Sequence, residues 1–195
     1  MCIRKAKLIP IMKIKFSFLF SLIFFSFIAS AQVRYYTKNA KINFFSETPL
    51  EDIEANNNSS VSVLDTQNGS LQFSLLVKGF EFKNEEMQEH FNDDYMESDK
   101  FPKAEFKGTV INHSSIDYKK PGNYNVQVKG LLTIRGVSKE VLSNGILKVN
   151  NDNIKANSTF NIALADYGIK IPKLVNDKIA KTIKITVDAK LDPLK

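Results

Sequence analysis

The chain has 195 residues, with 27 lysines and arginines against 21 aspartates and glutamates, and a formal net charge of +6. Five of the basic residues and no acidic residue lie in positions 1–31, which leaves 22 basic against 21 acidic residues in the rest. This near-neutral remainder excludes the strong positive charge that is typical of nucleic-acid-binding proteins. The single cysteine, Cys2, also lies in the first segment, so the remaining residues have no thiol for a disulfide or a nucleophile.

Positions 1–31 have the features of a secretory signal peptide. Basic residues such as Arg4 and Lys5 come first, an apolar run follows over positions 16–28, and Ala29-Ser30-Ala31 ends the segment. The apolar run is shorter than the roughly 20 residues that a membrane-spanning helix needs. We expect cleavage after Ala31, export to the periplasm or out of the cell, and one domain over residues 32–195 that does not span a membrane.

Most of this domain alternates between apolar and polar residues with the period of a β-strand. Strong turn formers separate the strands, at positions 67–69, 120–123 and 150–153, and Gly136 is predicted to form a hairpin corner with Val137 and Ser138. The apolar rows, in chain order, are Leu71, Phe73, Leu75 and Val77; Ala104, Phe106, Gly108 and Val110; Tyr124, Val126, Val128, Gly130, Leu132 and Ile134; Ile154, Ala156, Ser158, Phe160, Ile162 and Leu164; and Ile179, Ile183, Ile185, Val187, Ala189 and Leu191.

Two segments depart from the strand pattern. Residues 56–60 are asparagines and serines and are predicted to form a polar loop. Residues 84–91 are predicted to form a short helix, because Asn84 is a good N-cap and the two glutamates that follow it favour the positive end of a helix.

Strands with one apolar face bury that face in a sandwich or in a closed barrel. The strand from Tyr124 to Ile134 spans about 35 Å at ~3.3 Å per residue, and such length favours an elongated antiparallel barrel. The outward residues are polar, whereas a membrane-embedded barrel would present apolar residues outward. The predicted fold class is therefore all-β, with one short helix.

Four motifs in a fixed order resemble the YceI-like family over roughly residues 71–191. They are His90-Phe91, Phe101-Pro102-x-Ala104-x-Phe106, the run from Gly130 to Val137, and Asp166-Tyr167-Gly168. The resemblance implies an extended, lipocalin-like antiparallel barrel of eight strands. It also implies an exported protein that holds a polyisoprenoid, quinone-like or fatty-acyl lipid in its lumen.

The chain departs from the family pattern in three places, which bear on the head group of the ligand. The first strand, from Ala40 to Ser46, lacks the usual histidine, and Met87-Gln88-Glu89 replaces the usual arginine-aspartate pair before His90. Tyr95-Met96-Glu97 replaces the usual Phe-Phe-Asp.

The inward rows of such a barrel supply the predicted ligand-binding residues. His90 either contacts the head group at the barrel mouth or caps or packs against the loop that leads to Phe101. Gly130 has two explanations: it leaves room for a chain-shaped ligand, or it marks a bulge or bend in the wall. Phe44 and Phe45 are either a mouth-lining pair or buried strand aromatics. The predicted set is Phe73, Leu75, Val77, His90, Phe106, Val126, Val128, Gly130, Leu132, Ile134, Phe160, Ile162, Ile183 and Ile185.

Catalytic, metal and cofactor motifs are weak. No Gly-x-Ser-x-Gly and no glycine-rich phosphate loop occurs, and we expect no cofactor. Glu86 and His90, with Asp93 and Asp94 nearby, are too few for a convincing metal site. Four lysines at positions 170, 173, 178 and 181 either meet a phosphate-bearing ligand or form a solvated loop.

Three functions remain open from the sequence. The first is a carrier or store of lipid. We expect this function, and we therefore expect that the protein is not an enzyme. The second is an enzyme that uses the same cavity, with His90 and a carboxylate for proton transfer. The third is a structural or stress-response barrel filled by its own side chains.

Overall fold

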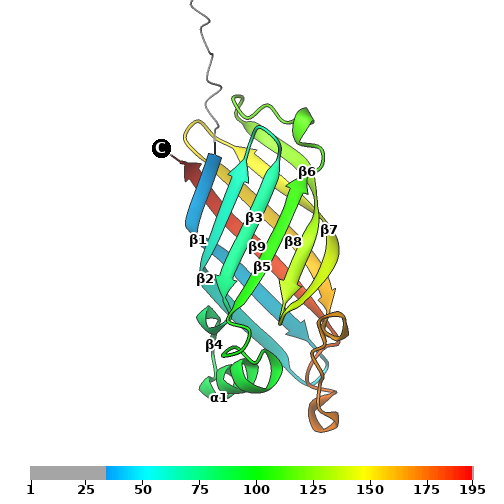
Figure 1. Ribbon diagram of the computed structural model, residues 1–195. Helices are drawn as coiled ribbons and strands as arrows, with labels where there is room; N and C mark the ends of the chain where they lie inside the picture. The colour runs from blue at the N-terminus through cyan, green and yellow to red at the C-terminus, as the bar shows by residue number, and fades with distance from the viewer. Residues whose placement is uncertain (1–33, 195) are drawn as a thin grey trace, which may run out of the picture. The chain divides into compact units, whose positions relative to one another are not determined.

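Eight long strands form a closed antiparallel barrel within residues 34–194, the part of the chain that the computed structural model describes (Figure 1). The predicted signal peptide lies outside the described residues. The long strands are β1 (Arg34–Glu47), β2 (Asp52–Asp65), β3 (Ser70–Leu76), β5 (Lys103–Val110), β6 (Gly122–Ile134), β7 (Val137–Val149), β8 (Ile154–Ala163) and β9 (Thr182–Pro193). A two-residue strand, β4 (Glu81–Phe82), pairs with β2.

Each long strand pairs antiparallel with the next long strand along the chain, and β1 closes the barrel by pairing with both β2 and β9. Closure leaves no free sheet edge along β1, which solves the main liability of an open sheet. The alternating rows predicted from the sequence face the interior in β3, β5, β6, β8 and β9. The predicted eight-stranded barrel with one short helix is therefore confirmed.

The predicted polar loop over residues 56–60 is wrong, because these residues continue β2. Asn57 is fully buried, and its side-chain oxygen accepts hydrogen bonds from the backbone and hydroxyl of Ser59 and from the hydroxyl of Ser60. Its amide nitrogen donates to the carbonyl of Leu76 at 3.0 Å. The bonds satisfy polar groups that would otherwise be costly to bury, so polar residues occupy an inward strand face here.

The hairpin corner between β6 and β7 is a two-residue turn of Arg135 and Gly136. Their φ angles are 50° and 74°. Positive φ at both positions is the signature of the type I′ turn that joins adjacent strands most tightly. Gly136 was correctly predicted to lie at the corner, but its partner is Arg135, and Val137 and Ser138 already belong to β7.

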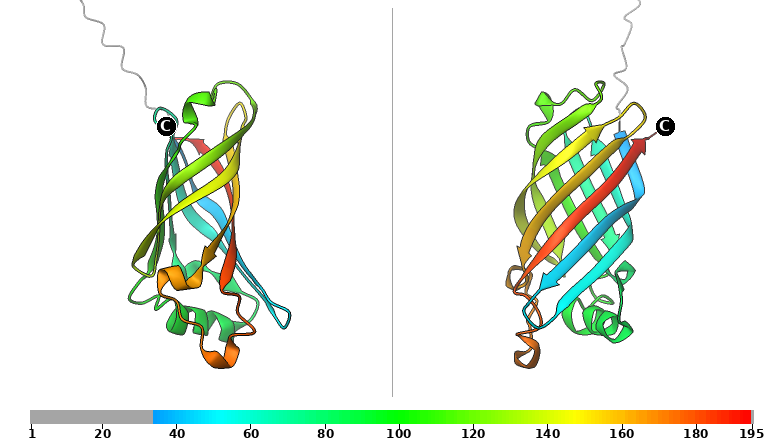
Figure 2. Two further views of the ribbon diagram at one scale, coloured as in Figure 1. Left: turned by 90° about the vertical axis from the view of Figure 1, so that its right-hand side faces the viewer. Right: turned by 180° about the vertical axis from the view of Figure 1, so that it is seen from behind.

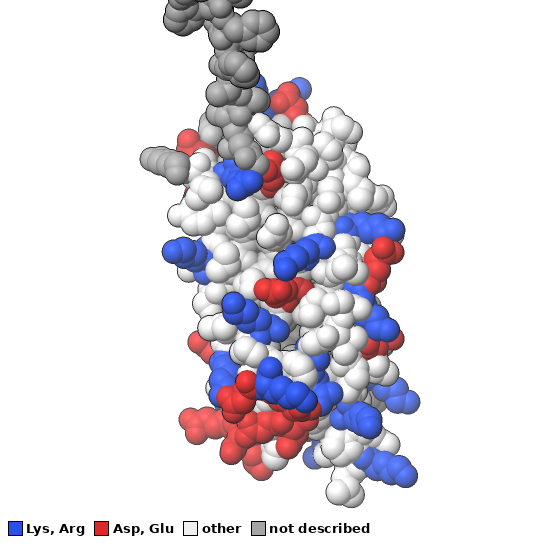
Figure 3. Space-filling view, in the orientation of Figure 1, with Lys and Arg blue, Asp and Glu red and all other residues white. Residues whose placement is uncertain are grey.

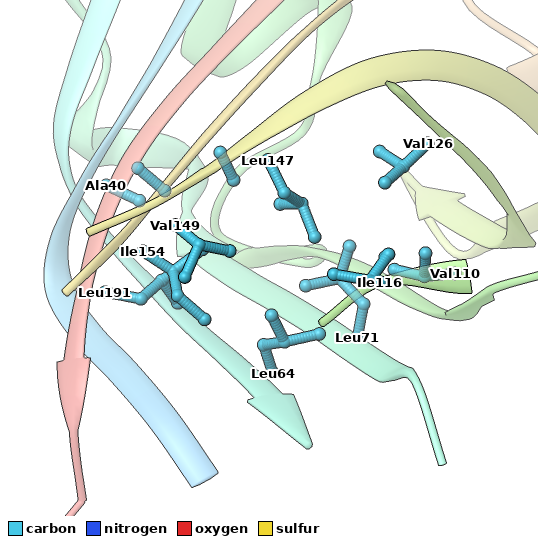
Figure 4. Packing of buried hydrophobic residues seen from close by; sticks show 12 residues of the cluster. Ala40, Leu64, Leu71, Val110, Ile116, Val126, Leu147, Val149, Ile154 and Leu191 are labelled. Carbon is cyan, nitrogen blue, oxygen red and sulfur yellow. The ribbon is translucent and has the colours of Figure 1, made fainter. Parts of the chain in front are cut away.

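One end of the barrel is closed by a cluster of branched aliphatic side chains that point toward one another (Figure 4). The connection between β5 and β6 contributes Ile116 and Tyr118 to this cluster, after the short 3-10 helix η3 (His113–Ser115). The cluster consists of Ala40, Leu64, Leu71, Val110, Ile116, Val126, Leu147, Val149, Ile154, Ala156, Ala189 and Leu191.

The opposite end carries the helix and the long connection between β8 and β9 (Figure 2). Helix α1 (Glu85–His90) begins at Asn84, whose side chain accepts from the backbone of Glu86 and Met87 as predicted. The helix continues as a π-helical segment, η2 (Phe91–Tyr95), and is therefore longer than the sequence indicated.

Gly130 lies where two strands approach closely. It pairs with Gly108 of β5, and a Cβ at Gly130 would lie 2.4 Å from the Gly108 Cα and 2.5 Å from the Lys107 carbonyl oxygen. The Phe106 ring lies over the same spot, with Cζ at 2.7 Å. The glycine pair thus lets an aromatic ring lie flat against the wall, an arrangement also used to compensate for glycines in designed sheets. The φ angle of Gly130 does not lie in the left-handed region, so its backbone conformation alone does not require glycine.

We predict that Gly130→Ala lowers the free energy of unfolding by about 1–3 kcal/mol, the usual cost of overpacking a tight site. Gly122→Ala is the matched control on the same strand, because a Cβ there meets only the Tyr124 ring, at 3.5 Å. That change is expected to stay within about 0.5 kcal/mol of the parent in urea melts. Equal melts for the two variants would contradict the close-approach explanation.

We predict that Tyr118→Phe stabilises the barrel at high pH. The Tyr118 hydroxyl is buried without a hydrogen-bond partner, and burial raises the pKa of Tyr118 to about 12. In the unfolded chain this hydroxyl ionises near pH 10, whereas in the folded chain it stays neutral up to about pH 12. The free energy of unfolding is therefore unaffected below pH 10 and falls as the pH rises toward 12. Urea melts of the phenylalanine variant should lack this part of the alkaline loss and match or exceed the parent at neutral pH.

Candidate functional site

An elongated cavity of about 470 Å³ runs along the barrel interior, from the closed-end cluster to helix α1. This volume lies within the range of about 300–1,000 Å³ found for ligand pockets. Side chains from every long strand line the cavity, and most of them are apolar. At the closed end it touches Leu64, Val110 and Leu191, and at the other end it touches His90, Val175 and Lys178.

All of the predicted ligand-binding residues except Gly130 line this cavity. Val77 reaches it from the 3-10 helix η1 (Val77–Gly79), just past the end of β3, and is fully buried there. Gly130 is instead packed against the backbone of β5, so its position does not support a role in making room for a ligand. The members that the structure brings together are Phe73, Leu75, Val77, His90, Phe106, Val126, Val128, Leu132, Ile134, Phe160, Ile162, Ile183 and Ile185.

Sequence reasoning missed most of an aromatic group near the α1 end of the cavity. Phe44 of β1 stacks on Phe91 at a centroid distance of 5.5 Å, and Phe80 and Phe82 contact both rings at 5.0–5.6 Å. All four line the cavity. The alternation of Phe80 and Phe82 around Glu81 was the available signal. Phe45 points away, with the Lys184 ammonium 4.6 Å from its ring centroid.

Three connections surround the α1 end of the cavity: helix α1, the turn between β1 and β2, and the connection between β8 and β9. We call this region the mouth. Glu51, Glu86, His90 and Lys178 contribute charged or titratable groups to its lining, and Lys178 lies 4.0 Å from Glu51. Acidic side chains gather at this end of the molecule (Figure 3), where α1 and η2 carry five of them in eleven residues.

His90 lies on the last turn of α1 with its side chain half exposed. Its Nδ1 lies 2.7 Å from a carboxylate oxygen of Asp94, and its Nε2 lies 3.8 Å from Glu86. The hydrogen bond to Asp94 raises the pKa of His90 above its usual value of 6.5, with a smaller contribution from the charge of Glu86. Near neutral pH, the mouth therefore carries a histidine that protonates more readily than a free one.

The four lysines for which a phosphate contact and a solvated loop were both considered do not gather at the cavity. Lys178 lines the cavity, whereas Lys170, Lys173 and Lys181 are exposed and lie outside the lining. Among residues 34–194, no group of three or more His, Cys, Asp or Glu side chains is arranged to hold a metal ion.

The sequence matches the YceI-like domain over residues 34–191, which is most of the chain. The chain belongs to the YceI-like domain family. No curated protein sequence matches it significantly.

Several solved structures share the fold of this chain. The chain is similar to a polyisoprenoid-binding domain from Saccharophagus degradans, with 14% identity, a TM-score of 0.73, and coverage of 84% of this chain and 99% of that one. It is also similar to BcnA of Burkholderia cenocepacia, with 18% identity, a TM-score of 0.64, and coverage of 78% and 95%. The Campylobacter jejuni YCEI protein has 18% identity, a TM-score of 0.52, and coverage of 70% and 81%. At these identities the likeness concerns the fold alone.

Within residues 34–194, no helix has both the length and the apolar character needed to cross a membrane.

We predict that the His90 pKa, measured by NMR titration, lies above 6.5 and falls toward this value in Asp94→Asn. Glu86→Gln is the control and should move it less, because Glu86 lies farther from the ring. A raised pKa means that the favourable His90–Asp94 interaction is complete below pH 6.5 and is lost as the pH rises through the folded-state pKa. An unchanged pKa in Asp94→Asn would contradict the assigned cause.

Proposed function

We propose that this YceI-like barrel binds one long apolar ligand, such as a polyisoprenoid, quinone-like or fatty-acyl lipid, and serves as its exported carrier or store. The observation that supports this most is the narrow cavity that runs along the barrel between rows of apolar side chains. A chain-shaped ligand matches such a cavity, whereas a compact polar substrate would leave most of the apolar wall without contacts. The S. degradans domain, whose fold this chain shares, is polyisoprenoid-binding.

The energetics favour an apolar chain. Burial of apolar surface contributes about 25 cal/mol per Å², so a chain that transfers several hundred Å² into the lumen gains several kcal/mol. Ordering the flexible chain and losing its translational freedom offset part of this gain. The net affinity then depends chiefly on how much of the chain the cavity accepts.

The difference between the two ends of the cavity supports a head group at the mouth. The closed end offers aliphatic side chains with the Tyr118 ring beside them, whereas the mouth offers His90, Lys178 and Ser46. A polar or anionic head group keeps partners and contact with water at the mouth, while its chain lies among apolar residues. In this proposal His90 and Lys178 are head-group contacts.

The proposal includes export. The basic start, apolar run and Ala29-Ser30-Ala31 support removal of residues 1–31 and a location in the periplasm or outside the cell. An aqueous compartment between lipid surfaces is where a closed apolar cavity is useful, because free long-chain lipids are nearly insoluble there.

Two alternatives have less support. A barrel filled by its own side chains does not agree with a cavity of this size. For an enzyme, the only histidine at the cavity is His90, and its carboxylate partners Glu86 and Asp94 are 80% and 63% exposed. This arrangement offers a solvated acid-base pair at the rim, so we propose binding and not catalysis.

We predict that organic extraction of the protein, purified without detergent, yields about one lipid per chain by mass spectrometry. Val128→Phe adds an aromatic ring inside the lumen and is expected to lower lipid affinity about tenfold or more, equal to about 1.4 kcal/mol. Gln127→Phe, one residue away on the exposed face, is the matched control and should retain the lipid.

A lipid-free parent protein that also takes up no lipid from vesicles would contradict the proposed function. Equal lipid recovery from the Val128 and Gln127 variants would show that the ligand lies outside the lumen.

A further inference from the structure

Closure of the barrel is incomplete between β7 and β8. These strands pair over only five residues each, Gly145–Val149 with Ile154–Ser158. Residues 137–144 of β7 still pair with β6, and residues 159–163 of β8 still pair with β9, but the two segments do not pair with each other. We call the space between these two segments the seam, and Figure 2 shows the strands diverging there toward the α1 end.

The cavity reaches both edges of the seam. Val141 and Ser143 line it from β7, and Phe160 and Ile162 line it from β8. Unpaired edges are what a closed barrel normally removes, because they leave backbone donors and acceptors without partners. A persistent seam beside a ligand cavity is therefore a candidate for a passage.

Where the seam begins, the inner cavity and a depression on the outer surface share lining residues. Ile146 and Asn157, a cross-strand pair, line the inner cavity and also a shallow depression on the outer surface. Gly145 lies beside them, and a Cβ there would be 2.7 Å from the Asn157 carbonyl oxygen. Gly145 and Ser158 also line both the cavity and the depression.

Hydrogen bonds, which we call ties, hold each end of the seam. The upper end is where the pairing of β7 with β8 stops, and the lower end is the one near α1. At the upper end, the Ser158 hydroxyl donates to the Asn144 carbonyl at 2.8 Å and lies 2.7 Å from the Ser143 hydroxyl. At the lower end, Arg135 donates to the Gly168 carbonyl at 2.7 Å. The 3-10 helix η4 (Leu164–Tyr167) fills the lower end with Tyr167, which is only 2% exposed. The upper end is therefore the part that can widen at the lower cost.

Apolar side chains also flank the seam on the outer surface. Leu131 and Leu142 are 53% and 62% exposed and are diagonal neighbours on β6 and β7. Leu142 belongs to the β7 segment that borders the seam. Together with Val141 on the inward face, they place apolar groups on both faces of that edge.

We propose that the seam is a side passage through which the apolar chain crosses the barrel wall, by release of the Ser143–Ser158 tie. This inference rests on the proposed function. A chain threaded through the mouth toward the closed end must leave its lipid surface along its whole length before it is buried. Passage through the seam moves each segment directly from a lipid surface held against Leu131 and Leu142 into the lumen, so little of the chain meets water.

A disulfide across the upper tie tests the passage. The hydroxyls of Ser143 and Ser158 lie 2.7 Å apart, so Ser143→Cys with Ser158→Cys, in a Cys2→Ser background, brings two thiols within reach of each other. The probe is solanesol, a linear polyisoprenoid alcohol, presented in phosphatidylcholine vesicles, and its uptake is followed by timed separation and mass spectrometry. We expect the oxidised form to take it up about tenfold more slowly, a barrier increase of about 1.4 kcal/mol, and to reach the same final amount per chain.

The reduced form of the same protein is the internal control and should load at least as fast as the parent, because two thiols replace the hydroxyl contact with a weaker one. The matched control is Thr159→Cys with Thr186→Cys, whose hydroxyls lie 3.4 Å apart on the paired strands β8 and β9 and whose disulfide leaves the seam free. Its oxidised form should load at the parent rate.

Equal rates for the oxidised and reduced Ser143/Ser158 variant would overturn the side passage while leaving lipid binding intact. An equal slowing by both disulfides would also overturn it, because general rigidity would then explain the effect. Absence of bound solanesol in every form, the parent included, would overturn the proposed function and this inference with it.

Discussion

The constraint on which the rest of the structure depends is the pairing of long strands that each have one apolar face. A strand such as β6 must bury alternate residues along its whole length and also satisfy its backbone on both sides. Eight strands meet both demands by closing on themselves through the pairing of β1 with β2 and β9. The interior of such a barrel is just wide enough for side chains to fill it or to leave room for one slender ligand.

The size of the inward side chains decides which of these outcomes occurs along the barrel. At the closed end, leucines and isoleucines such as Leu64, Leu147 and Ile154 fill the interior and are at most 2% exposed. Farther along, smaller residues line the interior on several strands: Ser60, Ala104, Ser143, Gly145 and Ser158. The cavity is thus a consequence of small residues in inward rows. Ser143, Gly145 and Ser158 also lie at the upper end of the seam, so these three small residues contribute both to the cavity and to the point where the pairing of β7 with β8 stops.

Much of the barrel follows from the sequence because period-two rows are a local property. The rows of β3, β5, β6, β8 and β9 could be predicted, since a one-residue shift would move every apolar side chain to water. β7 shows no clear row, because Lys139, Ser143 and Gly145 interrupt its apolar residues. β2 was taken for a loop at residues 56–60 because Asn57 is satisfied by partners such as the Leu76 carbonyl, nineteen residues away, which no local pattern reveals.

The candidate site also has a part that the sequence predicts and a part that it does not. Its wall follows from the rows, whereas its mouth depends on connections whose packing has no period. Phe44, Phe80 and Phe91 meet only because β1, the segment before β4, and the end of α1 converge at the mouth. Gly130 shows the limit of reasoning from a single strand. The two explanations considered for it, room for a ligand and a bend in the wall, both leave out the neighbouring strand. Only the register of β5 against β6 sets Gly130 opposite Gly108 under the Phe106 ring.

Closure and access make opposing demands on this barrel. Complete pairing of β7 with β8 would satisfy every backbone group along both strands, but it would seal the lumen along its length. The observed pairing stops at Gly145 and Ser158, and side-chain hydroxyls continue the contact for one further step. A hydroxyl hydrogen bond of this kind contributes about 0.5–1.5 kcal/mol to stability. Each further pair of residues in the ladder would add backbone hydrogen bonds, and these would have to break together before the strands could separate. The β7–β8 pairing is therefore present beside the closed-end cluster and absent along the seam beside the cavity. In the proposed function, this difference lets one fold both retain and exchange an apolar chain.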